Sequence, residues 1–150
     1  MKIISNNRKA YHDYAVLETI ECGIELRGSE VKSLRDGKIN LNDSFACIEE
    51  GEVVLYNANI SPYAQASYLN VDPVRARKLL LHKKQIVKLE TQTAQRGLTL
   101  VPIKIYFNLR GLVKIELALC KGKKLYDRRK DIKSREVERE VRRGLKSRRR

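Results

Sequence analysis

Apolar and polar residues alternate along much of the first 120 residues, which is the period of β-strands. Residues 14–20 are rich in strand-forming side chains, and a turn at Cys22–Gly23 is expected to separate them from a short continuation over 24–26. Residues 44–60 predict two strands joined by a glycine turn at Glu50–Gly51.

Two further strands are predicted on either side of a turn at Gly111. In the second of them, residues 112–119, apolar side chains point inward while Lys114 and Glu116 point outward. The first is expected to place the following residues on one face: Thr99, Val101, Ile103, Ile105 and Phe107.

Three short helices are predicted from capping residues. Ser29 can cap a helix that ends at Gly37. Asp72 followed by Pro73 predicts a helix through residue 82, because proline suits the first helical position. A further helix is expected over 83–96, ending before Gly97.

About six strands, mostly in hairpins, with two to three short helices favour an antiparallel β-barrel, because closure protects the edges of a small sheet. An open α+β sheet with one layer of helices is the alternative. No long apolar stretch begins the chain, which predicts neither a signal peptide nor a membrane span, and hence a cytoplasmic protein.

Positive charge is concentrated at the C-terminal end. The chain carries a net charge of +14, of which residues 121–150 hold +10 and the preceding 120 residues only +4. Acidic residues precede basic ones by four positions at Asp131/Arg135 and Glu138/Arg142, which favours a helix. A segment this polar is expected to be disordered when free and helical on a polyanion.

No sequence motif for catalysis or metal binding is evident. The three cysteines have no paired spacing and only two histidines accompany them, so no zinc site, cofactor or enzyme activity is predicted. RNA is the favoured partner. Three basic residues lie in the first turns of the predicted helix after Pro73: Arg75, Arg77 and Lys78. The helix dipole disfavours cations there. They are therefore either phosphate-binding residues or simply exposed basic residues.

Six sequence blocks resemble the SsrA-binding protein family, SmpB. They are NRKAYHDY (7–14), GSEVKSLRDGKIN (28–40), NISPY (59–63), DPVRARKLLLH (72–82), GLTLVPIKIY (97–106) and KGKKLYDRR (121–129). The resemblance implies an OB-like barrel over 1–122 and a tail over 123–150. Departures from the family pattern lie at 66–71 and 107–111.

The resemblance also implies a function. Such a protein binds the elbow of the tRNA-like part of transfer-messenger RNA, supports its alanylation, and delivers it to stalled ribosomes for trans-translation. Its partners would be that RNA, the ribosome's decoding centre and message channel, and, through the RNA, alanyl-tRNA synthetase and elongation factor Tu, with no membrane contact. A general OB-type RNA-binding protein and an RNA-modifying enzyme remain as alternatives.

Two groups of site residues follow. The RNA-binding group combines the residues implied by the resemblance with the basic residues after Pro73. Its members are Tyr14, Glu21, Arg75, Arg77, Lys78, Leu80, His82 and Lys114. The ribosome-binding group lies at the start of the tail: Lys121, Lys123, Lys124, Tyr126, Asp127, Arg128 and Arg129. By the resemblance, its last four residues, 126–129, lie where the family's tail enters the decoding centre.

Overall fold

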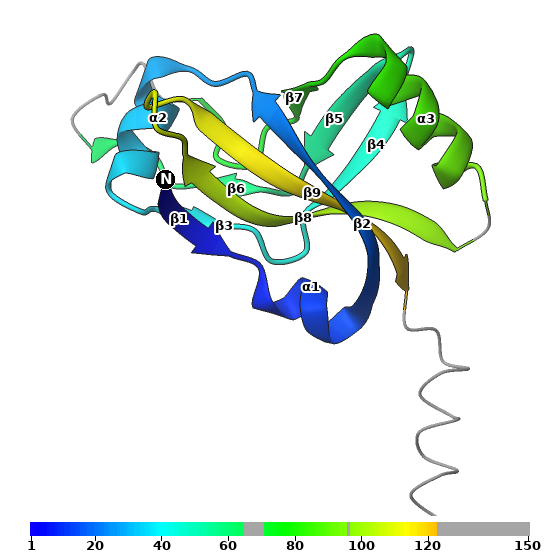
Figure 1. Cartoon of the computed structure of the whole chain (residues 1–150). Coiled ribbons are helices and arrows are strands. Elements are labelled where there is room, and N and C mark those ends of the chain that lie inside the picture. Colours follow the sequence, from blue (N-terminus) through cyan, green and yellow to red (C-terminus); the bar gives the residue numbers. More distant parts are fainter. Residues whose placement is uncertain (65–70, 96, 123–150) are drawn as a thin grey trace, which may run out of the picture.

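The computed structural model describes residues 1–64, 71–95 and 97–122 (Figure 1). The predicted contacts of residues 123–150 therefore lie outside the described residues. The elements follow one another as β1 (Lys2–Asn6), α1 (Arg8–Asp13), β2 (Tyr14–Ile24), α2 (Gly28–Arg35), β3 (Ile39–Asn40), β4 (Phe45–Glu49), β5 (Glu52–Tyr56), β6 (Asn59–Ile60), β7 (Arg77–Leu80), α3 (Lys83–Thr93), β8 (Leu98–Phe107) and β9 (Val113–Gly122). No helix in these ranges is both long and apolar enough to cross a membrane.

Six antiparallel strands form a closed ring. They are hydrogen-bonded in the order β8-β4-β5-β7-β2-β9, and β9 pairs with β8 to close the circle. The strand pairing between β4 and β8 is limited to one position, Ala46 opposite Leu100. β1 adds to β8, and β3 with β6 forms a separate two-stranded ribbon. The prediction of a mainly β fold on about six antiparallel strands is confirmed.

Two apolar clusters lie on opposite sides of the ring wall. The larger fills the interior with residues from every strand of the ring, and α2 and α3 add Leu34 and Leu89 to it. The smaller lies outside, where Ala10 of α1 packs on Val101, Ile103 and Ala118. In Figure 1, α1 lies below the ring and α3 at its upper right. The helices thus cover separate parts of the sheet and leave strand surface open between them.

An irregularity in β8 corrects the predicted single apolar face of residues 99–107. The register against β9 shifts between Pro102 and Lys104, so one extra residue is inserted there. As a result Val101 and Ile103 belong to the outer cluster, whereas Ile105 is in the interior. Because side chains alternate with period two, this one insertion reverses the facing of the rest of the strand.

The predicted helix over 73–82 is wrong. Its beginning is a turn in which the amide of Val74 donates to the Asp72 side chain over 3.0 Å. Residues Arg77–Leu80 are instead β7, and they alternate between buried and exposed. β7 pairs with β5 on one side and with β2 on the other, so it completes the ring. Pairing with two distant strands therefore outweighs the local helix signal.

Other boundaries agree more closely. The hairpin of β4 and β5 turns at Glu50–Gly51, both with positive φ, and α3 ends before Gly97 as predicted. β2, however, continues through Gly23 without the expected break. Ser29 does not cap α2; the helix begins at Gly28, and the Glu30 carboxylate accepts the amide of Arg27 over 2.8 Å. Sequence analysis also did not predict β1 or α1.

Candidate nucleic-acid interface

Four of the predicted RNA-binding residues line one groove of about 390 Å³ on the ring wall. Strand pairing brings them together, because Gly23 of β2 lies opposite Leu80 of β7 on one side and Lys114 of β9 on the other. Glu21 precedes Gly23 by two positions and so lies on the same face of the strand. The four residues are Glu21, Leu80, His82 and Lys114.

Glu21 is held by a residue that sequence analysis did not identify. The hydroxyl of Tyr106 in β8 donates to Glu21 Oε2, and Tyr106 is only 6% exposed. Burial, together with the hydrogen bond to this carboxylate, raises the pKa of Tyr106 well above its ordinary value. Tyr106 also pairs directly with Lys114 across β8 and β9. The strand register of the predicted hairpin around Gly111 is the signal that would have placed Tyr106 beside Lys114.

The cationic side of the groove is unpaired. Lys114 forms no ion pair with any side chain in the described parts of the chain, although Lys104 on the neighbouring strand lies 3.6 Å from Glu116. Its ammonium group is therefore available to a phosphate or to a base oxygen. The Glu21 carboxylate can accept hydrogen bonds from RNA, and the ammonium group of Lys114 can neutralise the charge of its phosphate backbone.

The apolar and histidine parts of the groove lie where β7 meets α3. Leu79 is in the core, whereas Leu80 is 49% exposed. His82 is exposed just before α3, and its backbone amide donates to Gln85 Oε1 over 3.1 Å. The start of α3 therefore fixes the position of His82. An exposed leucine beside a hydrogen-bonding side chain suits contact with an unstacked base.

Arg77 is not on the surface where sequence analysis placed it. Its side chain is fully buried, with Nε 2.6 Å from Glu30 Oε2. Its Nη1 and Nη2 donate to the carbonyl oxygens of Ala58 and Pro73, at 2.7 and 3.0 Å. Arg75 donates to the other oxygen of Glu30 and is one quarter exposed, at 26%. Both guanidinium groups therefore serve this buried cluster.

The Glu30 carboxylate is ionised at neutral pH because of its partners. Burial alone raises the pKa of Glu30, but hydrogen bonds from Arg75, the Arg27 amide and Arg77 outweigh it, so the pKa is lowered. Burial in turn lowers the pKa of Arg77, and Glu30 opposes that effect. The cluster ties α2 to the segment that leads into β7, and hence supports the strand that carries Leu80.

The remaining predicted residues are not in the groove. Lys78 is exposed and lies 3.0 Å from Glu52. Tyr14 begins β2, seven residues before Glu21, which is roughly 23 Å along an extended strand. It pairs there with Gly122, beside the exposed Lys121, so it lies where the described chain ends. The other tail residues, from Lys123 to Arg129, lie outside the described residues.

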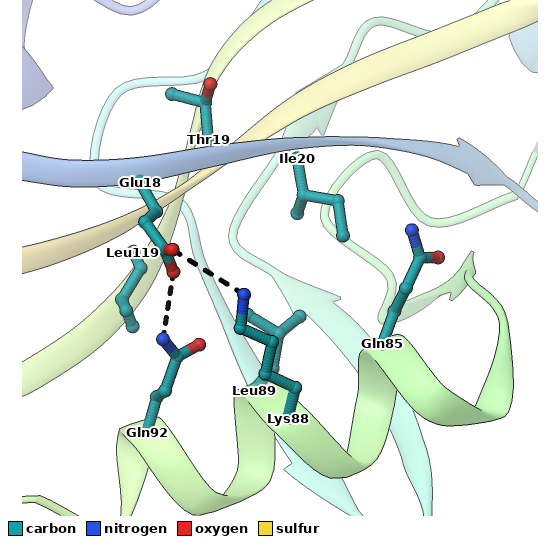
Figure 2. Close-up of a pocket in the computed structure, with 8 residues that line it drawn as sticks. All are labelled: Glu18, Thr19, Ile20, Gln85, Lys88, Leu89, Gln92 and Leu119. Atoms are coloured by element: carbon teal, nitrogen blue, oxygen red, sulfur yellow. Dashed lines mark hydrogen bonds and ion pairs between the residues drawn. The ribbon is translucent and has the colours of Figure 1, made fainter.

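A second cleft, of about 190 Å³, lies between β2 and α3 (Figure 2). Figure 2 shows Glu18 pointing from β2 toward two side chains of α3. Gln92 Nε2 donates to Glu18 over 2.9 Å, and Lys88 Nζ lies 3.6 Å from it. The hydrogen bond from Gln92, followed by the charge of Lys88, lowers the pKa of Glu18. Since its acid and base are already paired, this cleft is the weaker candidate for RNA.

The cysteines and histidines do not form a metal centre in the described ranges. All three cysteines are free, and Cys22 and Cys120 are buried. Burial raises the pKa of the Cys22 thiol to about 12 and that of Cys120 to about 11. Thiols of such high pKa are poor nucleophiles at neutral pH.

Comparison with known proteins shows the family of this chain. The family model for the SmpB protein matches residues 4–147. An SsrA-binding protein of Caldicellulosiruptor bescii is 58% identical over 146 residues, covering 97% of this chain and 92% of that one. An SsrA-binding protein of Enterococcus faecalis is 54% identical over 149 residues, covering 99% and 96%.

A solved structure shows the same relationship. One of its chains is 54% identical to this protein and superposes with a TM-score of 0.70, covering 83% of this chain and 87% of its own. That structure is described as tmRNA-SmpB in the centre of the bacterial ribosome. The chain studied here belongs to the SmpB family of SsrA-binding proteins.

Proposed function

We infer that this protein binds the tRNA-like elbow of transfer-messenger RNA and acts with it on stalled ribosomes in trans-translation. The carrying observation is the groove in which Glu21, Leu80, His82 and Lys114 meet, in a chain of the SmpB family. Relatives named for binding SsrA, and a related structure with tmRNA in the ribosome, support this function.

Each side chain of the groove has a distinct role in this proposal. Glu21, oriented by Tyr106, accepts hydrogen bonds from a base edge or a ribose hydroxyl. Lys114 contacts phosphate, and Leu80 packs on an unstacked base. His82 hydrogen-bonds from its fixed place before α3. None of these roles requires a chemical step, so we propose an adaptor that supports alanylation of the RNA without catalysing it.

The tail is proposed to act on the ribosome. Residues 123–150 would be disordered when free and become helical in the message channel, where the decoding centre would meet Tyr126, Asp127, Arg128 and Arg129, with Lys121, Lys123 and Lys124 at the root. The net charge of +10 over 121–150 supports contact with ribosomal RNA. Alanyl-tRNA synthetase and elongation factor Tu would be met through the RNA, in the cytoplasm where ribosomes are.

A competition titration tests the function. The full chain is titrated against a labelled tRNA-like domain at near-physiological salt, with bulk tRNA as competitor. We expect strong preference for the tRNA-like domain. Glu21→Gln should weaken that complex about tenfold, the range of a lost hydrogen bond to a charged group, and should barely change binding to bulk tRNA.

Glu25→Gln is the matched control, because Glu25 is an exposed carboxylate just beyond the end of β2 and does not line the groove. It should bind as the unchanged protein does. No preference between the two RNAs would reduce the protein to a general RNA binder. Equal losses for both RNAs on Glu21→Gln would make Glu21 merely structural.

A further inference from the structure

A second, apolar cleft adjoins the groove on the other side of Gly23, Leu80 and Lys114. This cleft measures about 320 Å³ and lies where the end of β2, the start of α2, β7 and the β8–β9 turn come together. Its walls are Ile24, Leu26, Val31, Leu80, Leu112 and Val113. Gly23, Leu80 and Lys114 line both this cleft and the groove, so the two hollows are adjacent and share a wall.

Two leucines at the mouth of the cleft are unusually exposed. Leu80 is 49% and Leu112 54% exposed, although each has apolar neighbours in the wall. Gly23 also lines the cleft, opposite Leu80 across β2 and β7. A Cβ at Gly23 would come within 3.2 Å of the Leu80 Cβ and 3.4 Å of its Cδ1, so the glycine lets Leu80 lie close against the strand. A side chain at position 23 would force Leu80 to shift from this position.

We propose that this cleft takes one unstacked nucleobase of the RNA bound in the groove. The inference rests on the proposed function and names a second subsite for the same ligand. A base has two apolar faces that can be buried between aliphatic side chains, and its sugar carries the charged backbone away from them. Lys114 makes no ion pair within residues 1–64, 71–95 and 97–122 and lines both hollows, so it lies where the phosphate between the two nucleotides would pass.

A nucleic acid fits this cleft better than an apolar peptide does. The cleft is adjacent to the Glu21–Lys114 groove, and the charged residue in the wall they share, Lys114, is cationic. The nearby turn adds the exposed Arg110, and the chain as a whole carries +14. A polyanion would be attracted to Lys114 and Arg110, which lie at the shared wall and at the nearby turn.

The test compares two leucines of the same turn in the full chain. Leu112→Ser removes one wall of the cleft. Leu109→Ser is the matched control, because Leu109 is 93% exposed and does not line the cleft. Binding to a folded tRNA-like domain should weaken about tenfold for Leu112→Ser, the range for loss of one base contact, and remain unchanged for Leu109→Ser. Thermal unfolding of both variants should match that of the unchanged protein.

A fluorescent base locates the contact. 2-Aminopurine is placed in turn at each unpaired nucleotide of the elbow. At one position we expect its emission to rise on binding, as the base leaves its RNA neighbours, and we expect that rise to be lost with Leu112→Ser but kept with Leu109→Ser. Absence of such a position would overturn the proposal.

The remaining outcomes separate this inference from the function itself. If Glu21→Gln weakens binding and Leu112→Ser does not, the base subsite is wrong while the RNA groove stands. If neither weakens binding, both are wrong. If Leu112→Ser spares RNA binding but abolishes peptide tagging on ribosomes, the cleft meets a protein or the ribosome, and the base proposal is overturned.

Discussion

Glu21 is an exposed carboxylate on a surface proposed to bind a polyanion, where its charge by itself would repel the ligand. The hydroxyl of Tyr106 donates to it and fixes its direction. A carboxylate contributes to RNA binding only if its oxygens meet base or ribose donors, so the orientation decides whether Glu21 helps or hinders. Tyr106 is therefore a positioning residue for the groove.

Tyr106→Phe tests that role. The variant should lose about 1.5 kcal/mol of unfolding free energy, the low end for a hydrogen bond to a charged group, because water can reach the exposed Glu21. Affinity for the tRNA-like domain should fall about fivefold, since ordering a freed side chain costs roughly 0.5–1.5 kcal/mol. Unchanged affinity in the competition titration would show that Glu21 needs no support.

The same variant carries a pH signature. The pKa of Tyr106 is raised above its ordinary value of 10.0, so the folded protein holds this proton more tightly than the unfolded chain does. The stability that Tyr106 adds is therefore fully present below about pH 10 and is lost as the pH rises further. Urea unfolding at pH 8 and pH 11 should show the difference between the parent protein and Tyr106→Phe shrinking at the higher pH.

At the scale of elements, a buried ion cluster connects β7 and the residues before it to α2. The Glu30 carboxylate of α2 forms ion pairs with both Arg75 and Arg77, and the Arg77 side chain is fully buried. A buried guanidinium that loses its counter-charge is costly, whereas the intact pair adds little over apolar packing. The cluster thus restricts how the segment before β7 can lie against α2.

Glu30→Gln should lower the unfolding free energy by about 3–5 kcal/mol, because it leaves Arg77 buried without a negative partner. The control is Glu52→Gln, which removes the exposed ion pair with Lys78, the neighbour of Arg77 in β7. This change should lower the unfolding free energy by at most about 1 kcal/mol. Urea unfolding at pH 7 measures both. A Glu30→Gln protein as stable as the control would mean that the cluster adds no net stability.

Acid should remove this contribution. The pKa of Glu30 is lowered from its ordinary 4.5, so the unfolded chain takes up the proton more readily than the folded protein does. The stability from Glu30 is therefore present above about pH 4.5 and is lost as the pH falls through the folded-state pKa. The gap between the parent protein and Glu30→Gln should accordingly narrow between pH 5 and pH 3.

For the whole molecule, charge and shape contribute separately to RNA binding. Lys114→Gln should reduce the slope of log affinity against log salt by about 0.7–0.9, the value for one phosphate contact. Leu80→Ser should weaken binding to the tRNA-like domain with the slope unchanged, because a base contact releases no counterion. A changed slope for Leu80→Ser would mean that the leucine acts by moving charged neighbours.

The division between barrel and tail is tested by truncation after Gly122. The shortened chain should keep its preference for the tRNA-like domain, since the groove lies entirely in β2, β7, β9 and the start of α3. Tagging on stalled ribosomes should be abolished, because the tail is proposed to occupy the message channel. Loss of both activities together would contradict this division of roles.

Local patterns in the sequence determined the hairpin at Glu50–Gly51, the helix before Gly97, the alternation of β9 and the concentration of charge at the C-terminal end. The family resemblance also indicated Glu21, Leu80, His82 and Lys114, which the structure brings into one groove. These features depend on neighbouring residues or on a pattern of residues kept in order, so one sequence suffices to predict them.

Only the tertiary structure decided the rest. Asp72–Pro73 is a local helix signal, but β5 and β2 offer hydrogen bonds to both edges of residues 77–80, and a strand satisfies more backbone groups there. The bulge in β8 and the contacts of Glu30 with Arg77 and of Glu21 with Tyr106 likewise join residues far apart in the chain. Such partners are selected by closure of the ring, and local sequence carries no signal for them.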